Sequence, residues 1–281
     1  MRDWLRGGMA AARVAASRAE LWVPGAIVSF AFAGWVAFLL VVGTPPDESD
    51  VVYFGVRLAA SPWWPWNLVA LVMAALSGIG TMLLAIAFGE VALLMGLSDR
   101  EWDRILITVP RAMAALGVAG CGVALVIAVL MWLAAPIFFE AYTQPDPSTP
   151  YAIRVAVGAW PALVVLAAVA AVAQAFGALA LRHPWRVALS TLRRRAHRLL
   201  PQAALTTAGF LGSQVLTVLL LGSVWEPLSE RLADGRLAEP ATPILLLGFV
   251  WIWLVLVLLA GVVQAWISAW WSWELSPQPE R

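Results

Sequence analysis

Six long apolar stretches constrain the fold of this chain more than any other feature of its sequence. They cover roughly residues 22–43, 67–91, 113–137, 155–181, 203–224 and 243–271. About 20 consecutive apolar residues form a helix that crosses the ~30 Å hydrocarbon core of a bilayer. The chain is 62% hydrophobic and only 12% charged, which is more apolar surface than a soluble protein can bury. We therefore predict an all-α integral membrane protein with six transmembrane helices in a single transmembrane domain, residues 1–281.

The arginines predict the orientation, because positively charged short loops stay on the cytoplasmic side of a membrane. Most of them fall in the N-terminal segment, in the loops at 97–112 and 182–200, and in the C-terminal tail. The other loops are acidic and rich in proline, and they contain only Arg57, Arg154, Arg231 and Arg236. We predict a multi-pass protein of the cytoplasmic (inner) membrane with both termini in the cytoplasm.

Two groups of tryptophans flank the apolar stretches. Trp63, Trp64 and Trp66 precede the second stretch, and the end of the sixth contains Trp266, Trp270, Trp271 and Trp273. Tryptophan is enriched at membrane–water interfaces. We expect these rings to lie at the two headgroup levels.

An internal threefold repeat is also predicted. An Arg-Ala pair is followed by a helix-breaking residue at the same offset three times, from Arg18 to Pro24, Arg111 to Gly117 and Arg195 to Pro201. Strongly polar residues near the cytoplasmic ends of the even-numbered spans, Glu90, Gln174 and Gln264, share a period of about 90 residues with these pairs. The pattern predicts units of about 1–96, 97–182 and 183–281. Each unit would contain an interfacial amphipathic helix and two spans.

The interfacial helix is most distinct in the third unit, at residues 185–199. Helical spacing puts five apolar residues on one face, namely Trp185, Leu189, Leu192, Ala196 and Leu199. The remaining positions hold Arg186, Arg193, Arg194, Arg195 and Arg198. Trp102, Leu106, Val109, Met113 and Leu116 repeat the apolar offsets in the second unit. Such a helix lies in the headgroup plane with its apolar face down, so the sequence predicts a contact with anionic lipid headgroups or with a protein partner.

Glu90 is the acidic residue inside or beside a predicted span. Ionisable groups in a membrane are costly and often functional, but Glu90 could also reach the interface or pair with a loop arginine. Gln174 and Gln264 are expected to form interhelical hydrogen bonds. If the repeats pack around a pseudo-threefold axis, Glu90, Gln174 and Gln264 would converge as a polar cluster near the inner leaflet.

No pattern in the sequence predicts catalysis or metal binding. Gly117, Gly120 and Gly122 are interpreted as small residues at a close helix contact. His183 and His197 have no Cys, Asp or Glu at metal-ligand spacing and are expected at the headgroup level. The motifs of serine hydrolases, zinc peptidases and phosphate-binding loops do not occur. We predict no catalytic residues, no metal, no cofactor and no nucleic-acid partner.

The segments at 18–24, 111–117 and 195–201 give the chain an order in which an amphipathic helix and two spans occur three times. This order resembles a group of poorly characterised six-span prokaryotic membrane proteins, which includes the membrane domain of some glycerophosphodiester phosphodiesterases. The resemblance covers nearly the whole chain. It implies the six-span fold and no catalytic residue, since the phosphodiesterase chemistry belongs to a soluble domain of those proteins.

The stretch from Glu90 through Gly96 to Pro110 also loosely resembles the coupling-helix region of six-span permease subunits of ABC exporters. The threefold pattern is not expected of such subunits. We therefore predict first a non-enzymatic scaffold, accessory or regulatory subunit that contacts anionic lipid or an unidentified protein subunit. The alternatives are a permease subunit of an ABC-type exporter and an intramembrane enzyme.

Overall fold

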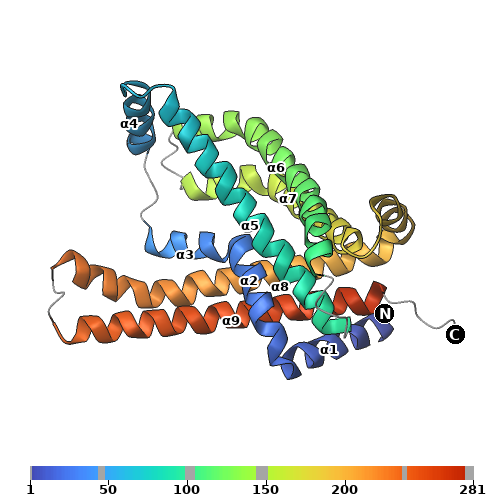
Figure 1. The fold of residues 1–281 in the computed structure, drawn as a ribbon. Coiled ribbons are helices and arrows are strands. Elements are labelled where there is room, and N and C mark those ends of the chain that lie inside the picture. The colour runs from blue at the N-terminus through green and yellow to red at the C-terminus, as the bar shows by residue number, and fades with distance from the viewer. Residues whose placement is uncertain (1, 44–47, 99–104, 144–150, 236–238, 276–281) are drawn as a thin grey trace. The chain divides into compact units, whose positions relative to one another are not determined.

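The computed structural model describes residues 2–43, 48–98, 105–143, 151–235 and 239–275, which form helices and no strands (Figure 1). In chain order the elements are α1 (Arg2–Ser17), η1 (Ala19–Leu21), α2 (Trp22–Ser29), η2 (Phe30–Gly34), α3 (Trp35–Val42), α4 (Glu48–Ala59), α5 (Trp66–Ser98), α6 (Ile105–Thr143), α7 (Tyr151–Ala180), α8 (Trp185–Ala233) and α9 (Ala241–Leu275). Here η1 is a 3-10 helix and η2 is a π-helix. The prediction of an all-helical chain is confirmed.

Five helical stretches among the described residues are long and apolar enough to span a membrane. They are Ala19–Val42, Trp66–Leu97, Thr108–Leu130, Trp185–Ala233 and Ala241–Leu275. The fourth predicted span, residues 155–181, falls on α7, of whose side chains only a part is described. There the described apolar helix is Ala168–Ala180, which is shorter than a span. A sixth span and the threefold repeat therefore stay predictions.

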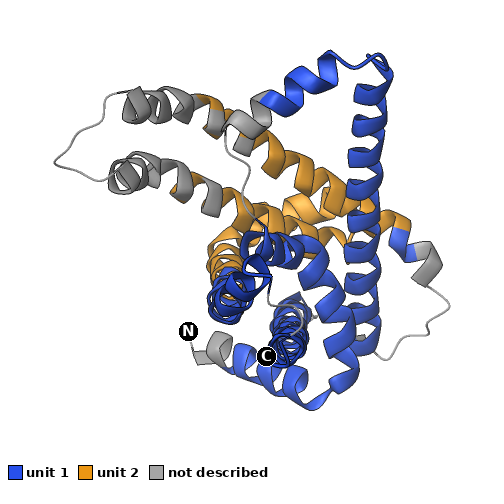
Figure 2. Cartoon of the chain, turned by 90° about the vertical axis from the view of Figure 1, so that its left-hand side faces the viewer, with its two compact units in different colours: residues 1–109, 210–281 blue, residues 110–209 orange. Residues whose placement is uncertain are grey.

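The chain divides into two compact units (Figure 2). Unit 1 contains residues 1–109 and 210–281, and unit 2 contains residues 110–209. The boundaries fall inside the continuous helices α6 and α8 and do not follow the predicted repeat boundaries. Helix α4, which belongs to unit 1, occupies a loop for which the sequence predicted no helix.

In unit 1, Arg18 separates the amphipathic helix α1 from the first span. Its backbone, with φ −110° and ψ 87°, is not helical. The indole N–H of Trp22 donates to the carbonyl oxygen of Ala15 at 2.7 Å. The Arg18 guanidinium donates to the carbonyl oxygen of Gly96 at 2.9 Å, in the last turn of α5. Helix ends leave such carbonyls without intrahelical donors. These two bonds therefore connect the non-helical break at Arg18 to the ends of α1 and α5.

Arg195 marks a second break, inside α8, where φ is −112° and ψ is 16°. Pro201 follows six residues later in α8. Its missing N–H removes one backbone hydrogen bond from the helix on the C-terminal side of Arg195. The arginines of the first and third Arg-Ala pairs thus lie where an amphipathic segment meets an apolar one. Arg111, in the second pair, lies within the continuous helix α6.

Helices α2 and α9 cross in backbone contact at Gly25 and Gly261. A Cβ atom added to Gly25 would overlap the carbonyl oxygen of Gly261, and one added to Gly261 would lie 2.7 Å from the backbone nitrogen of Ala26. On α5, a Cβ atom added to Gly89 would lie 2.9 Å from the carbonyl oxygen of Pro24. Glycine therefore permits two close helix crossings, which is how small residues act in membrane bundles.

The glycines that the sequence suggested for such a crossing do not make one among the described residues. A Cβ atom added to Gly117, Gly120 or Gly122 meets no described atom within 4 Å. All three glycines lie on α6. Their spacing in the sequence does not say whether that face of the helix contacts a neighbouring helix.

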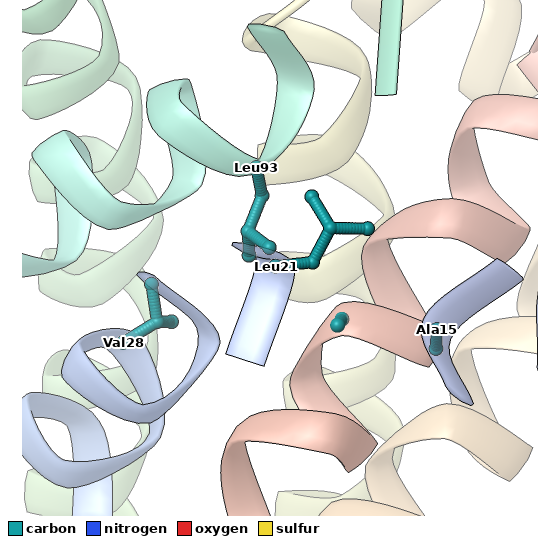
Figure 3. Close-up of a cluster of buried hydrophobic side chains, with 5 residues drawn as sticks. Ala15, Leu21, Val28 and Leu93 are labelled. Atoms are coloured by element: carbon teal, nitrogen blue, oxygen red, sulfur yellow. The ribbon is translucent and has the colours of Figure 1, made fainter. Parts of the chain in front are cut away.

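Buried apolar side chains fill the space around the α2 crossings (Figure 3). The cluster consists of Ala15, Leu21, Val28, Leu93 and Ala265, which come from α1, η1, α2, α5 and α9. Leu21 and Leu93 are at most 1% exposed. This cluster therefore joins the amphipathic helix to three of the candidate spans.

The tryptophans at the end of α9 pack against α1. Trp270 and Trp271 are 3% and 2% exposed, and Trp270 forms a buried cluster with Ala11 and Ala269. A Cβ atom added to Gly8 would lie 3.3 Å from the Trp270 ring. Both rings are therefore covered by protein, and for Trp270 the small residues of α1 leave the surface that the ring covers. Their location at a headgroup level stays a prediction. Trp63 and Trp66, by contrast, are exposed.

The C-terminal part of α8 and the N-terminal part of α9 pack together within unit 1. Leu221 and Leu228 pack with Phe249 and Leu256, and Trp225 contacts Phe249 at a ring-centroid distance of 5.1 Å. Gly235 follows α8 with φ 72°, the left-handed conformation that commonly ends a helix. An exposed ion pair between Arg231 and Glu239, at 3.1 Å, lies beside the turn.

In unit 2, α7 and α8 both carry buried alanines and leucines. Buried residues include Ala175, Leu179, Ala188, Leu199 and Ala203. The guanidinium of Arg182 donates to the carbonyl oxygen of Ala178 at 2.7 Å and so satisfies an acceptor at the end of α7.

The Gly25–Gly261 contact predicts that Gly261→Ala destabilises the protein by about 1–3 kcal/mol, because the new methyl group displaces backbone atoms of α2. Gly248→Ala is the matched control, since that glycine is also on α9 and has nothing within 4 Å. The free energy of unfolding in mixed detergent micelles measures both. Equal stability of the two variants would contradict the close crossing.

Candidate functional site

Glu90 lies on α5, is half-buried, and accepts two hydrogen bonds from α9. The amide Nε2 of Gln264 donates to Oε1 at 2.5 Å, and the hydroxyl of Ser268 donates to Oε2 at 3.2 Å. Gln264 and Ser268 are one helical turn apart and are 8% and 4% exposed. The two donors therefore stabilise a carboxylate that would be costly in an apolar setting.

Two further contacts join the same ends of the helices. The indole N–H of Trp266 donates to the carbonyl oxygen of Gly8 on α1 at 3.1 Å. Arg18 reaches the carbonyl oxygen of Gly96, in the same final part of α5 as Glu90. Helices α1, α5 and α9 are thus tied together by polar bonds, and the arrangement acts as a helix tether.

Gln174 belongs to unit 2 and has partners of its own. Its carbonyl oxygen Oε1 accepts hydrogen bonds from the hydroxyls of Thr206 at 2.8 Å and Thr207 at 2.9 Å, both on α8. The structure thus brings Glu90 and Gln264 together in unit 1 and describes Gln174 in unit 2. Convergence of all three residues stays a prediction.

Gln202, on α8 in unit 2, is a buried polar residue that the sequence analysis missed. It is fully buried, and neither its amide nitrogen nor its amide oxygen has a hydrogen-bond partner among the described residues. It precedes Thr206 by one turn and so shares the face that contacts α7. The helical spacing to Thr206 was the available signal, but Gln202 falls between the predicted basic helix at 185–199 and the predicted span at 203–224 and was assigned to neither.

Ser29 and Gln214 form a second unforeseen contact, in unit 1. The amide Nε2 of Gln214 on α8 donates to the hydroxyl oxygen of Ser29 on α2 at 3.1 Å. Gln214 is 8% exposed and Ser29 is 1% exposed. A Gln within the fifth apolar stretch was the available sequence signal, while a single Ser in a span is too common to indicate a contact.

The segment at 185–199, hereafter the basic helix, keeps its charged side chains on the surface. Exposed side chains are those of Arg186, Arg193, Arg194, Arg195 and Arg198. Arg186 lies over the Trp185 ring, with 5.4 Å between its guanidinium carbon and the ring centroid. A guanidinium on an indole face is a favourable cation–π contact.

Comparisons with known protein families, with curated proteins and with solved structures find no match to this chain. Among the described residues, no group of three or more His, Cys, Asp and Glu side chains is arranged to hold a metal ion.

The Glu90 contact predicts that Glu90→Leu destabilises the protein by about 1–3 kcal/mol, because the buried donors of Gln264 and Ser268 lose their acceptor. Glu90→Gln retains one acceptor oxygen and should lose less. The measurement is the free energy of unfolding in mixed micelles.

A double-mutant cycle with Gln264→Leu measures the interaction energy between Glu90 and Gln264 apart from their other contacts. The double variant should lose less free energy of unfolding than the sum of the losses in the two single variants. Strict additivity would show that Glu90 and Gln264 do not interact, and Glu20→Leu controls for loss of an exposed carboxylate on unit 1.

Proposed function

We propose that this chain is a non-enzymatic, multi-pass protein of the cytoplasmic membrane, acting as a scaffold or accessory subunit that binds anionic lipid headgroups through the basic helix. The observation that carries the proposal is the order of side chains around that helix. Apolar residues that face protein, apolar residues that are exposed, and arginines follow one another around its circumference.

The order follows from the helical rotation of 100° per residue. Ala188, which belongs to unit 2, is fully buried. Next around the helix come Trp185 and Leu189, which are 61% and 47% exposed, and then Arg193 and Arg186, which are exposed. A helix with these three sectors has one side for protein, one for acyl chains and one for headgroups.

The charge of the basic helix gives it a preference among lipids. Each arginine near an anionic surface contributes about 1 kcal/mol, and salt reduces this contribution. Planar guanidinium groups also bind phosphate oxygens through two hydrogen bonds. Phosphate-bearing anionic lipids are therefore the partners proposed here.

A sixth span on α7 completes the proposed topology. An even number of spans would put both termini on the side where most arginines lie, and positive charge marks the cytoplasmic side. The likeness of the Arg18 and Arg195 breaks supports a common ancestry for the first and third repeat units. The proposed relationship to six-span prokaryotic membrane proteins rests on these two segments and on the segment at 111–117.

A permease subunit of an ABC-type exporter is the second candidate, favoured by a carboxylate inside a span. It would need an ATPase from another chain. The segment proposed for its coupling helix includes residues 99–104, which lie outside the described residues. Co-purification of an ATPase with the solubilised protein, together with loss of export in Glu90→Gln, would support this candidate over the scaffold.

For the lipid contact, we expect Arg186→Gln, Arg193→Gln and Arg194→Gln together to weaken retention of phosphatidylglycerol by about tenfold or more at low salt, because three surface charges are lost. Retention by the detergent-solubilised protein is measured by native mass spectrometry, with phosphatidylcholine as the neutral reference lipid.

The matched control is Arg13→Gln, Arg57→Gln and Arg111→Gln, which removes the same charge from exposed arginines elsewhere. This control should keep most of the phosphatidylglycerol. An equal loss in both triple variants would mean that total charge, and not the basic helix, determines the binding.

For the topology, we expect alkaline phosphatase to be active when fused after Gly235 and inactive when fused after Leu275. Green fluorescent protein at the same positions should give the opposite result, since it fluoresces when folded in the cytoplasm. The reason is the excess of arginine on one set of loops. The same reporter active at both positions would exclude a cytoplasmic C-terminus with Gly235 outside.

A further inference from the structure

A buried polar group lies beside the π-helix η2 in unit 1. Ser29 is the residue directly before η2, and Gln214 and Thr217 face it from α8. Their side chains are 1%, 8% and 8% exposed. A π-helix is a rare distortion that is frequently found at functional sites, so this group differs from ordinary packing between spans.

The three polar side chains line a small cavity together with Gly34 of η2 and Ala260 of α9. The cavity has about 10 Å³ of room for the centre of a water molecule. A single buried water needs roughly 10–15 Å³ by this measure and two to four polar partners. The cavity therefore matches one water molecule in size.

The hydrogen bonds around the cavity leave capacity for that water. Ser29 accepts a bond from Gln214 Nε2, and its own hydroxyl hydrogen has no acceptor among the described residues. The hydroxyl of Thr217 donates to the carbonyl oxygen of Ser213 at 2.9 Å, so its oxygen lone pairs are still available. The carbonyl oxygen Oε1 of Gln214 likewise has no donor among the described residues. One donor and two acceptors thus belong to side chains that line the cavity.

We propose that this cavity is a binding site for one structural water molecule, which accepts a hydrogen bond from Ser29 and donates to Gln214 and Thr217. Such a water joins α2, η2 and α8 of unit 1. Water inserted beside a helix ladder is a recognised cause of local distortion. The site thereby accounts for the π-helix at Phe30–Gly34.

Water fits this site better than a cation. The lining contains no carboxylate, and Leu256, Val257 and Ala260 of α9 form an apolar wall. An ion there would lose its hydration shell with no opposite charge to compensate for it. A neutral molecule with two hydrogens and two lone pairs meets no such cost.

Hydroxyl-radical labelling tests the proposal on the full-length protein in lipid nanodiscs. X-rays generate radicals from bound water, and mass spectrometry detects oxidation of adjacent side chains. Trp253 lines the cavity and is the reporter. Trp251, which is exposed on the outer surface of α9, controls for radicals from elsewhere, and the buried Trp271 gives the background.

We expect Trp253 to be oxidised at least severalfold faster than Trp271, and Ser29→Ala and Gln214→Leu each to reduce that rate towards background. Ser213→Ala is the matched control, because Ser213 does not line the cavity, and it should leave the rate unchanged. Labelling of Trp253 at background in the unaltered protein would overturn the proposal.

The two variants protect the test against a folding failure, since Ser29→Ala removes a single oxygen atom and Gln214→Leu nearly preserves volume. Unchanged Trp253 oxidation in a folded Ser29→Ala variant would also overturn the proposal. So would thermal stability that rises severalfold more with sodium chloride than with choline chloride, because that result would assign the cavity to a cation.

Discussion

The close crossing of α2 and α9 at Gly25 and Gly261 is the contact on which the rest of unit 1 depends. In lipid, apolar surface alone gives helices little reason to associate, so packing and polar bonds must hold them together. The crossing sets both the depth and the rotation of α9. One turn before Gly261, Val257 lines the cavity beside η2, and about one turn after it, Gln264 reaches Glu90.

The helical class of the fold could be predicted from sequence because a 20-residue apolar stretch has few other solutions in a membrane. The breaks at Arg18 and Arg195 were also foreseeable, since each lies between an amphipathic pattern and a proline. The helix pairs were not foreseeable. Gly117 and Gly25 look alike in sequence, and only the neighbouring helix distinguishes an open glycine from one in a crossing.

The same reasoning applies to the polar residues. Glu90 and Gln264 are large polar groups in apolar stretches, which made them candidates without any structure. Hydroxyl groups give a weaker signal because most of them bond within their own helix, as Thr217 does to Ser213 and Ser213 does to Phe210. Ser29 is different because it accepts a hydrogen bond from another helix. A contact between helices depends on their packing, which the sequence does not give. The buried face of α1 was not predicted for a related reason. Its residues are small, and the large side chains that cover them are tryptophans of α9.

The polar contacts also explain why a scaffold is proposed ahead of a transport subunit. A carrier must exchange between two arrangements of its helices, and an exchange that separated α5 from α9 would break the bonds from Gln264 and Ser268 to Glu90. Leaving those buried groups unpaired costs about 1–3 kcal/mol for each, in addition to the separation of backbones at Gly25 and Gly261. An arrangement held by both close packing and satisfied polar bonds favours one state of unit 1. A protein that binds lipid at its surface through the basic helix needs only that one state.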